Sequence, residues 1–391
     1  MTRNIVICCD GTGNEIEANL SNVLKLYRVL TKNTEQVVFY DPGVGTMSST
    51  DPWSRWKAKV RSVWGLATGW GIDDNVLDAY RFLVEHYRDG DRVYMFGFSR
   101  GAYTVRMLAG FLRLVGLLRA EQAHLARYAL TAYKRAAEQD DFTIAWRFER
   151  VAETRRVPIA FMGLWDTVAS MIVPRPDRFF LPSLQRLPYT MSNDRVRVVR
   201  HAIAADERRR MFRPYRWTPA QTYKPNPFSP ADGEPQDVRE VWFAGSHGDI
   251  GGGYPETESG AAKFPLRWVI DEAVGQGLLI KRAMYNHLVL GAKRQGGSRT
   301  YVAPSTSAPL HNSVRSFWCV LEVLPKRTKY RDWAARPALC GLYLPLAEPR
   351  TIPNGDLVHH TVFERRDTDT AYRPPNLPER EAVTIIETEL P

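Results

Sequence analysis

Short apolar runs rich in β-branched residues alternate with amphipathic segments along the first 280 residues. The apolar runs predict buried strands at 4–9, 36–40 and 92–98, and within 157–168 and 239–254. Apolar residues at helical spacing predict helices at 21–30, 75–87, 100–118 and 271–280. Because buried strands alternate with helices, the pattern predicts an α/β fold: a mainly parallel sheet with helices on both faces.

Polar and glycine-rich residues follow the predicted strands. These clusters begin at Asp10, Asp41, Gly97, Asp166 and His247. In a parallel sheet the carboxyl ends of the strands meet at one edge, and ligands bind there. The sequence therefore predicts a functional site at this edge of the sheet.

One of these junctions reads Gly97-Phe98-Ser99-Arg100-Gly101 and matches G-x-S-x-G, the nucleophile elbow. A serine on such a strand-to-helix turn has a strained backbone, and bulky side chains two residues away would collide with the strand or the helix. Its hydroxyl projects above the positive end of the helix, where the N–H of Arg100 would face a developing oxyanion. The alternative is a serine that only caps the helix. The buried strand before Ser99 and the helix after it favour the nucleophile.

A serine nucleophile needs a base, and the base needs an orienting acid. In the α/β-hydrolase order both follow the serine, the acid first, and each comes just after a later strand. Asp166 and His247 occupy such positions. The alternatives are a helix N-cap for Asp166 and a structural role for His247. His201, His311 and His359 are the competing candidates for the base.

The loop Asp10-Gly11-Thr12-Gly13-Asn14 after the first strand has small residues that let a ligand approach the backbone. One interpretation makes Gly11 and Thr12 the second half of an oxyanion hole, with Asp10 fixing the loop. A phosphate-cradling loop and a tight turn capped by Asp10 are the alternatives.

Asp249 follows the candidate base by two residues. It either holds the glycine-rich loop around it or replaces Asp166 as the acid. A metal site of Asp10, Asp166, His247 and Asp249 is a further alternative, because all four follow strands. No metal-ligand spacing motif accompanies these residues.

The composition is that of an ordinary globular protein, with 44% hydrophobic and 25% charged residues in 391. A net charge of +10 favours anionic partners such as phospholipid surfaces. Arginines recur singly, apart from Arg208-Arg209-Arg210, and no nucleic-acid-binding motif accompanies them. We therefore expect contact with an anionic membrane rather than with nucleic acid.

The four cysteines give no sign of a disulfide framework, which suits a reducing compartment. Asp10 interrupts the apolar N-terminal stretch, so the sequence predicts no signal peptide. No apolar run approaches the roughly 20 residues of a transmembrane helix. We expect a cytoplasmic protein, whose export would need a route without a signal peptide.

Several stretches together resemble the α/β-hydrolase domain of class-1 type VI secretion phospholipase effectors and of related uncharacterised bacterial and fungal proteins. The resemblance covers about residues 3 to 280. The blocks occur in this order: CDGTGN, DPGVGT, GFSRGAYTVR, GLWDTV, HAIAADERR and WFAGSHGDIGGGY. It implies a Ser-Asp-His hydrolase with Ser99 as nucleophile, and it suggests Asp166 and His247 as acid and base. For the effector branch it implies hydrolysis of lipid esters.

We expect an α/β-hydrolase catalytic domain over 1–280, in which the Pro- and Arg-rich segment 171–236 forms a cap or insertion. Residues 281–391 are predicted to be a C-terminal extension packed on the same domain. The predicted activity is a lipase- or phospholipase-like serine esterase that acts on an ester or lipid and needs no cofactor. The oligomeric state is left open. The alternatives are a metal-dependent phosphoesterase and a non-catalytic hydrolase-fold module that binds anionic lipid or protein.

Overall fold

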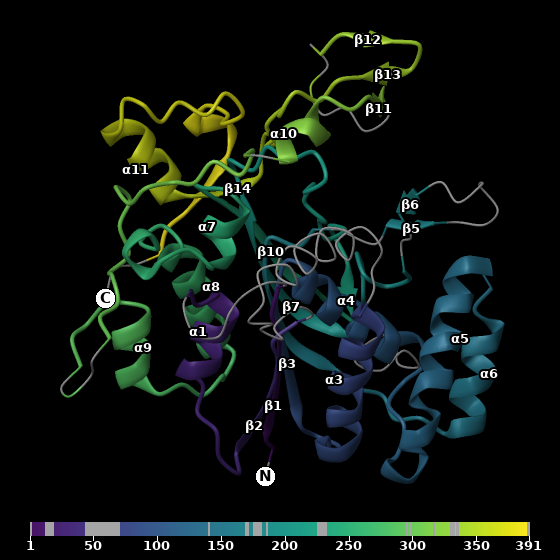
Figure 1. The fold of residues 1–391 in the computed structure, drawn as a ribbon. Coiled ribbons are helices and arrows are strands. Elements are labelled where there is room, and N and C mark those ends of the chain that lie inside the picture. Colours follow the sequence, from purple (N-terminus) through teal and green to yellow (C-terminus); the bar gives the residue numbers. More distant parts are fainter. Residues whose placement is uncertain are drawn as a thin grey trace, which may run out of the picture.

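Eight parallel strands form one sheet at the centre of the computed structural model (Figure 1). They are β1 (Asn4–Cys9), β2 (Gln36–Asp41), β3 (Arg92–Phe98), β4 (Ile159–Trp165), β7 (Val196–Ala204), β10 (Asp237–Phe243), β14 (Leu357–His359) and β15 (Thr384–Ile386). Their order across the sheet is β15-β14-β10-β7-β4-β3-β1-β2. The structure describes residues 2–11, 19–43, 71–139, 141–168, 172–174, 182–184, 187–224, 233–294, 296, 299–315, 317–328, 333 and 336–388.

Helices cover both faces of the sheet, and each face has its own apolar core. In β1, Ile5, Ile7 and Cys9 belong to one core, and Val6 and Cys8 to the other, because successive strand residues point to opposite faces. The first core lies beneath α3 (Ile72–His86), α4 (Arg100–Leu114), α5 (Ala126–Gln139) and α6 (Thr143–Ala152). The second lies beneath α1 (Asn22–Val29), α8 (Lys263–Gly275) and α9 (Arg282–Leu288). The predicted α/β fold class is confirmed.

The predicted elements of the first half agree closely with the observed ones, and one later helix does not. The strands expected at 4–9, 36–40 and 92–98 are β1, β2 and β3. The helix expected over 271–280 is the last part of α8, which ends at Gly275. The chain turns there, and Gly277 has a φ of +94°, which a glycine adopts without strain.

Residues 196–204 lie inside the segment predicted as a cap, yet they form β7 in the middle of the sheet, between β4 and β10. The cap prediction is wrong for these residues. Arg200 and His201 interrupt the apolar run of this strand, and both are buried with carboxylate partners. Arg200 pairs with Asp237, and His201 pairs with Glu240.

Smaller elements surround the sheet. Two antiparallel pairs join β5 (Ile172–Pro174) to β6 (Pro182–Leu184) and β8 (Thr222–Tyr223) to β9 (Glu234–Pro235). Short turns of 3-10 helix occur at Ala120–Leu125, Glu256–Glu258 and Arg380–Ala382. The other α-helices in the described residues are α7 (His247–Gly251), α10 (Phe317–Glu322) and α11 (His360–Thr368). In the described part of the chain, no helix is long and apolar enough to cross a membrane.

The C-terminal part of the chain adds two strands to the main sheet and also forms a separate small sheet. The strand β14 pairs with β10, and β15 pairs with β14. Between α10 and β14 the chain forms a small antiparallel sheet of β11 (Lys326–Arg327), β13 (Leu342–Tyr343) and β12 (Ala338–Leu339). This sheet protrudes beyond the carboxyl ends of the central strands (Figure 1).

Candidate active site

Ser99 joins β3 to α4 with a φ of 56° and a ψ of −119°. Backbone geometry of this kind is rare outside glycine and costs about 1–3 kcal/mol, so the surroundings must hold it in place. The N–H of Ser99 donates to the carbonyl oxygen of Trp165, 3.1 Å away at the end of the neighbouring strand β4. Ser99 is therefore held on a sharp turn at the carboxyl edge of the sheet, where the sequence placed it.

Gly97 and Gly101 lie where β3, α4 and β1 pass one another. A Cβ on Gly97 would lie 2.5 Å from the carbonyl group of Gly101. A Cβ on Gly101 would overlap the carbonyl group of Cys9 in β1. Backbone cannot yield as a flexible side chain can, so each position excludes any side chain.

His247 begins α7, directly after β10. Its Nε2 lies 2.8 Å from the Oγ of Ser99, and its Nδ1 lies 2.6 Å from Oδ2 of Asp166. A carboxylate only accepts hydrogen bonds, so Nδ1 carries the proton and Nε2 accepts from the serine hydroxyl. The structure thus joins Ser99, His247 and Asp166 in one hydrogen-bonded chain.

Burial lowers the pKa of His247, although the hydrogen bond and charge of Asp166 oppose this shift. The imidazole lies between two aromatic rings, with centroid distances of 4.7 Å to Phe98 and 4.9 Å to Phe212. The ring is therefore neutral at neutral pH, as a proton acceptor must be.

Asp166 is fully buried and directly follows β4. Its Oδ1 accepts from the N–H of Ala204 at 3.0 Å and from Nη1 of Arg350 at 2.6 Å, and its Oδ2 accepts from Nη2 of Arg350 at 3.0 Å. Burial alone would raise the pKa of Asp166. The charge of Arg350 and the hydrogen bonds from His247 and Arg350 outweigh burial and hold that pKa well below its ordinary value. Asp166 is therefore a carboxylate.

The loop after β1 lies beside Ser99, where a Cβ on Gly11 would stand 3.4 Å from the serine Cβ. The N–H of Gly11 donates to Oδ1 of Asp10 at 2.7 Å, so this donor is turned to the loop itself. The oxyanion role of Gly11 stays a prediction, and it would require this N–H to leave Asp10 for the substrate. Thr12 lies outside the described residues. Arg100 follows Ser99 as the first residue of α4, where backbone N–H groups have no acceptor within the helix.

Asp10 fixes its loop, as the sequence suggested. In addition to the N–H of Gly11, the Asp10 carboxylate accepts hydrogen bonds from the hydroxyl of Ser21 and, at 2.9 Å, from that of Tyr40. These contacts occupy oxygens that the alternative metal site would use. Within the described ranges, no group of three or more His, Cys, Asp or Glu residues is placed to hold a metal ion.

Two of the competing histidines have other partners. The Nε2 of His201 accepts from the N–H of Thr167 at 3.0 Å, and its Nδ1 donates to Glu240 at 2.8 Å. Both ring nitrogens of His359 bind threonine hydroxyls. Neither histidine has a nitrogen directed at Ser99.

His311, the third competitor, bonds to Asp249 rather than to the serine. Its Nδ1 donates to Oδ1 of Asp249 at 2.6 Å, and its ring stacks on Tyr254 at 3.5 Å. The other oxygen of Asp249 accepts from the N–H and hydroxyl of Ser246, the N-cap of α7, at 2.8 and 2.9 Å. Asp249 therefore holds the first turn of the helix that begins at His247.

Two residues at the site were missed by the sequence analysis. Glu207 accepts from the N–H of His247 at 3.1 Å. Burial opposes ionisation of Glu207, but Arg209 binds its carboxylate and lowers the pKa to about 2. Glu207 does lie in the family-like block HAIAADERR, whereas Arg350 is a single arginine in an irregular, proline-containing stretch and carried no signal.

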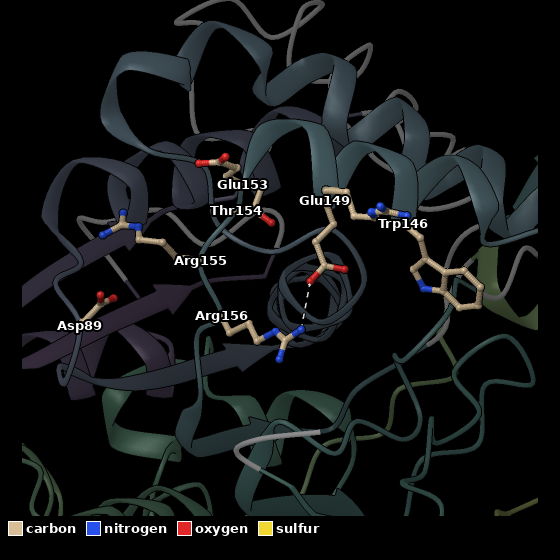
Figure 2. A pocket seen from close by; sticks show the side chains of 8 residues that line it. Asp89, Trp146, Glu149, Glu153, Thr154, Arg155 and Arg156 are labelled. Atoms are coloured by element: carbon tan, nitrogen blue, oxygen red, sulfur yellow. Dashed lines mark ion pairs between the residues drawn. The ribbon is translucent and has the colours of Figure 1, made fainter. Parts of the chain in front are cut away.

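A cavity of about 870 Å³ lies at the other end of the sheet. Figure 2 shows its lining, which includes Trp146 and Glu149 of α6 and Arg156, which pairs with Glu149 at 3.7 Å. Asp89 and Arg156 precede β3 and β4, whereas the candidate site residues follow these strands. None of the candidate site residues lines this cavity.

A family model described as "T6SS, Phospholipase effector Tle1-like, catalytic domain" matches residues 3–272. The uncharacterized protein YEL023C of Saccharomyces cerevisiae is 33% identical over 242 residues, which cover 58% of this chain and 34% of the yeast protein. The chain thus spans about a third of that relative.

Two solved structures are similar. One is an uncharacterized protein from Pseudomonas aeruginosa, with a TM-score of 0.38 and 18% identity over 72% of this chain and 46% of that one. The other is the Tle1 effector bound to the VgrG spike of the type 6 secretion system, with a TM-score of 0.33 and 17% identity over 67% of this chain and 53% of that one. The matches span about half the length of each solved chain.

Proposed function

Because the chain belongs to the family of Tle1-like type VI secretion phospholipase effectors through their catalytic domain, we propose that it is a serine hydrolase of lipid esters. The observation that carries this proposal is the hydrogen-bonded chain from Ser99 through His247 to Asp166. A non-catalytic module with this fold has no need of a histidine 2.8 Å from a strained serine.

In the proposed first step, Ser99 Oγ forms a bond to the carbonyl carbon of the ester while His247 Nε2 takes the hydroxyl proton. The carbonyl oxygen becomes an oxyanion, for which the backbone N–H of Arg100 is a donor. Asp166 stays ionised and stabilises the imidazolium. When the carbon–oxygen bond to the alcohol breaks, His247 gives its proton to the leaving oxygen.

In the proposed second step, water attacks the acyl-enzyme. His247 removes a proton from the water, a second tetrahedral oxyanion forms, and the bond from the carbonyl carbon to Ser99 Oγ breaks. The proton returns to Ser99, and the carboxylic acid leaves. The neutral state of His247 allows it to act as base in both steps.

We also propose that the protein contacts an anionic lipid surface through the protruding sheet and the residues around it. Most of the large hydrophobic side chains that the described chain exposes lie between Val320 and Leu346. Leu339 and Leu342 are cross-strand partners and are 80% and 43% exposed. Exposed apolar side chains concentrated in this way are typical of an interaction surface.

The charges of this stretch complement an anionic surface. Lys326, Arg327 and Arg336 reach solvent, whereas Glu322 is buried. The stretch also adjoins the candidate active site, because the Trp318 ring of α10 packs at 5.2 Å on Phe212, which contacts His247. A lipid bound here would lie at the carboxyl end of the sheet, where Ser99 also lies (Figure 1).

All four cysteines, Cys8, Cys9, Cys319 and Cys340, are free thiols. Free thiols support our proposal that the protein resides in a reducing compartment such as the cytoplasm. Cys319 and Cys340 are exposed, so an oxidising compartment would expose them to disulfide exchange.

The proposed activity is tested with Ser99→Ala and a fluorophosphonate probe, together with turnover of short-chain aryl esters. We expect the wild-type protein to be labelled and the variant to lose labelling and at least about 1000-fold of its turnover, because the nucleophile is gone. Ser259→Ala, at a buried serine outside the site, is the matched control and keeps both signals. Equal labelling or turnover in Ser99→Ala would refute the proposal.

A further inference from the structure

Arg350 comes from the part of the chain beyond the family match, 184 residues after Asp166, yet it contacts both oxygens of that carboxylate. Asp166 is 0% and Arg350 3% exposed. The guanidinium is itself fixed, since Nη1 donates to the carbonyl of Ala204 at 2.9 Å and Nε to that of Phe212 at 3.0 Å. A planar fork held in this way meets the carboxylate in one orientation.

We propose that Arg350 is a positioning residue for ester hydrolysis, which keeps Asp166 ionised and directed at His247. This inference rests on the proposed function. Oδ1 of Asp166 is held by Arg350 and by the N–H of Ala204, while Oδ2 receives both Arg350 and His247. The arginine thus fixes the rotation of the carboxylate that orients the imidazole.

The charge of Arg350 matters because, among the described residues, it is the cation that contacts Asp166 when the imidazole is neutral. The titratable groups that face Asp166 are Arg350, His247 on α7 and His201 on β7. Glu207 lies near His247 and Arg350 and is itself paired with Arg209. Without the guanidinium, burial would favour the protonated acid, which accepts more weakly from the Nδ1–H of His247 and carries no charge to stabilise the imidazolium.

The test compares Arg350→Met with wild type by the pH dependence of kcat/KM for p-nitrophenyl butyrate and of fluorophosphonate labelling. We expect the acid limb of both profiles to move to higher pH, because the carboxylate loses its neighbouring cation and its protonation then contributes to the limb that His247 sets in the wild type. Arg200→Met is the matched control. It removes a buried arginine that binds both oxygens of Asp237 at 3.0 and 2.6 Å, and its acid limb stays in place.

A loss of activity that is equal at every pH, with the acid limb unmoved, would overturn the inference. Arg350→Lys decides the question if the methionine variant does not fold. Lysine keeps the charge but loses the fork, so we expect kcat to fall about 10- to 100-fold with KM unchanged, as for a misoriented base. A lysine variant with wild-type kcat and KM would also overturn the inference.

The failure of this inference is distinguishable from failure of the proposed function. If Ser99→Ala is inactive and Arg350→Met has the wild-type acid limb, only the role of Arg350 is refuted. If Ser99→Ala remains active, the proposed function itself is refuted, whatever the arginine variants do.

Discussion

At the residue scale, the sheet holds the backbone of Ser99, and the helix α7 holds its hydroxyl. Its N–H is bound to the end of β4, and its Oγ to the imidazole that follows β10. The crossing of β3 and α4 fixes the positive φ of Ser99. The hydroxyl is therefore held in the orientation in which it meets the imidazole of His247. A serine that only capped α4 would bond its own helix, and Ser99 makes no side-chain cap bond.

The protonation state of His247 gives a prediction for the wild-type pH profile. Below its pKa the imidazole is protonated and cannot accept the Ser99 proton, so kcat/KM falls as the pH falls. Since burial lowers that pKa from 6.5, we expect the acid limb to lie below pH 6.5 and activity to be level around neutrality. Measurement of kcat/KM against pH checks this. An acid limb above pH 6.5 would contradict the burial argument.

At the element scale, β1 and α4 approach each other backbone to backbone beside the elbow. Gly101→Ala would drive a Cβ into the carbonyl of Cys9, and neither the central strand nor the buried helix has room to shift. We expect a loss of about 3 kcal/mol or more in unfolding free energy, measured by denaturant titration.

The matched control for this prediction is Gly275→Ala, at the end of α8, where an added Cβ meets nothing within 4 Å. We expect its unfolding free energy to be unchanged or slightly higher, because alanine restricts the unfolded chain. Similar stability of the two alanine variants would show that β1 and α4 can separate at little cost.

The strands that the sequence predicted well have six or seven residues, enough for a hydrophobic pattern to show. The strand, turn and helix around Ser99 can be predicted from local sequence alone. The signals are the apolar run 92–98 and the glycines at 97 and 101. By contrast, β14 and β15 have three residues each, too few for a period to appear. Arg350 is beyond local prediction for a different reason, since its partner lies 184 residues away.

At the scale of the whole molecule, we propose that residues 281–391 pack on the same domain as 1–280. The pairing of β14 and β15 with the central sheet and the contact of Arg350 with Asp166 support this proposal. The boundary predicted at residue 280 therefore marks a change in the sequence pattern. The candidate site contains residues from both sides of that boundary.

The proposed lipid surface gives a prediction for the whole protein. Leu339→Glu with Leu342→Glu should lower partitioning onto vesicles of phosphatidylcholine and phosphatidylglycerol about 10- to 100-fold, because two apolar side chains lose their burial in lipid. Cosedimentation measures this. Val151→Glu, at an 85% exposed valine on α6, is the control and binds as wild type does. Equal binding by the double variant, or none by wild type, would refute the proposed surface.

The contact between Asp166 and Arg350 also has a consequence for biosynthesis. At about 5–20 residues per second, the ribosome adds Arg350 about 10–40 s after Asp166. From the addition of His247 until that of Arg350, the nascent chain holds the candidate nucleophile and its histidine but not the cation beside the buried acid. If Arg350 acts as proposed, ribosome-bound chains stalled between residues 247 and 350 react more slowly with a serine-directed probe than chains stalled after residue 350.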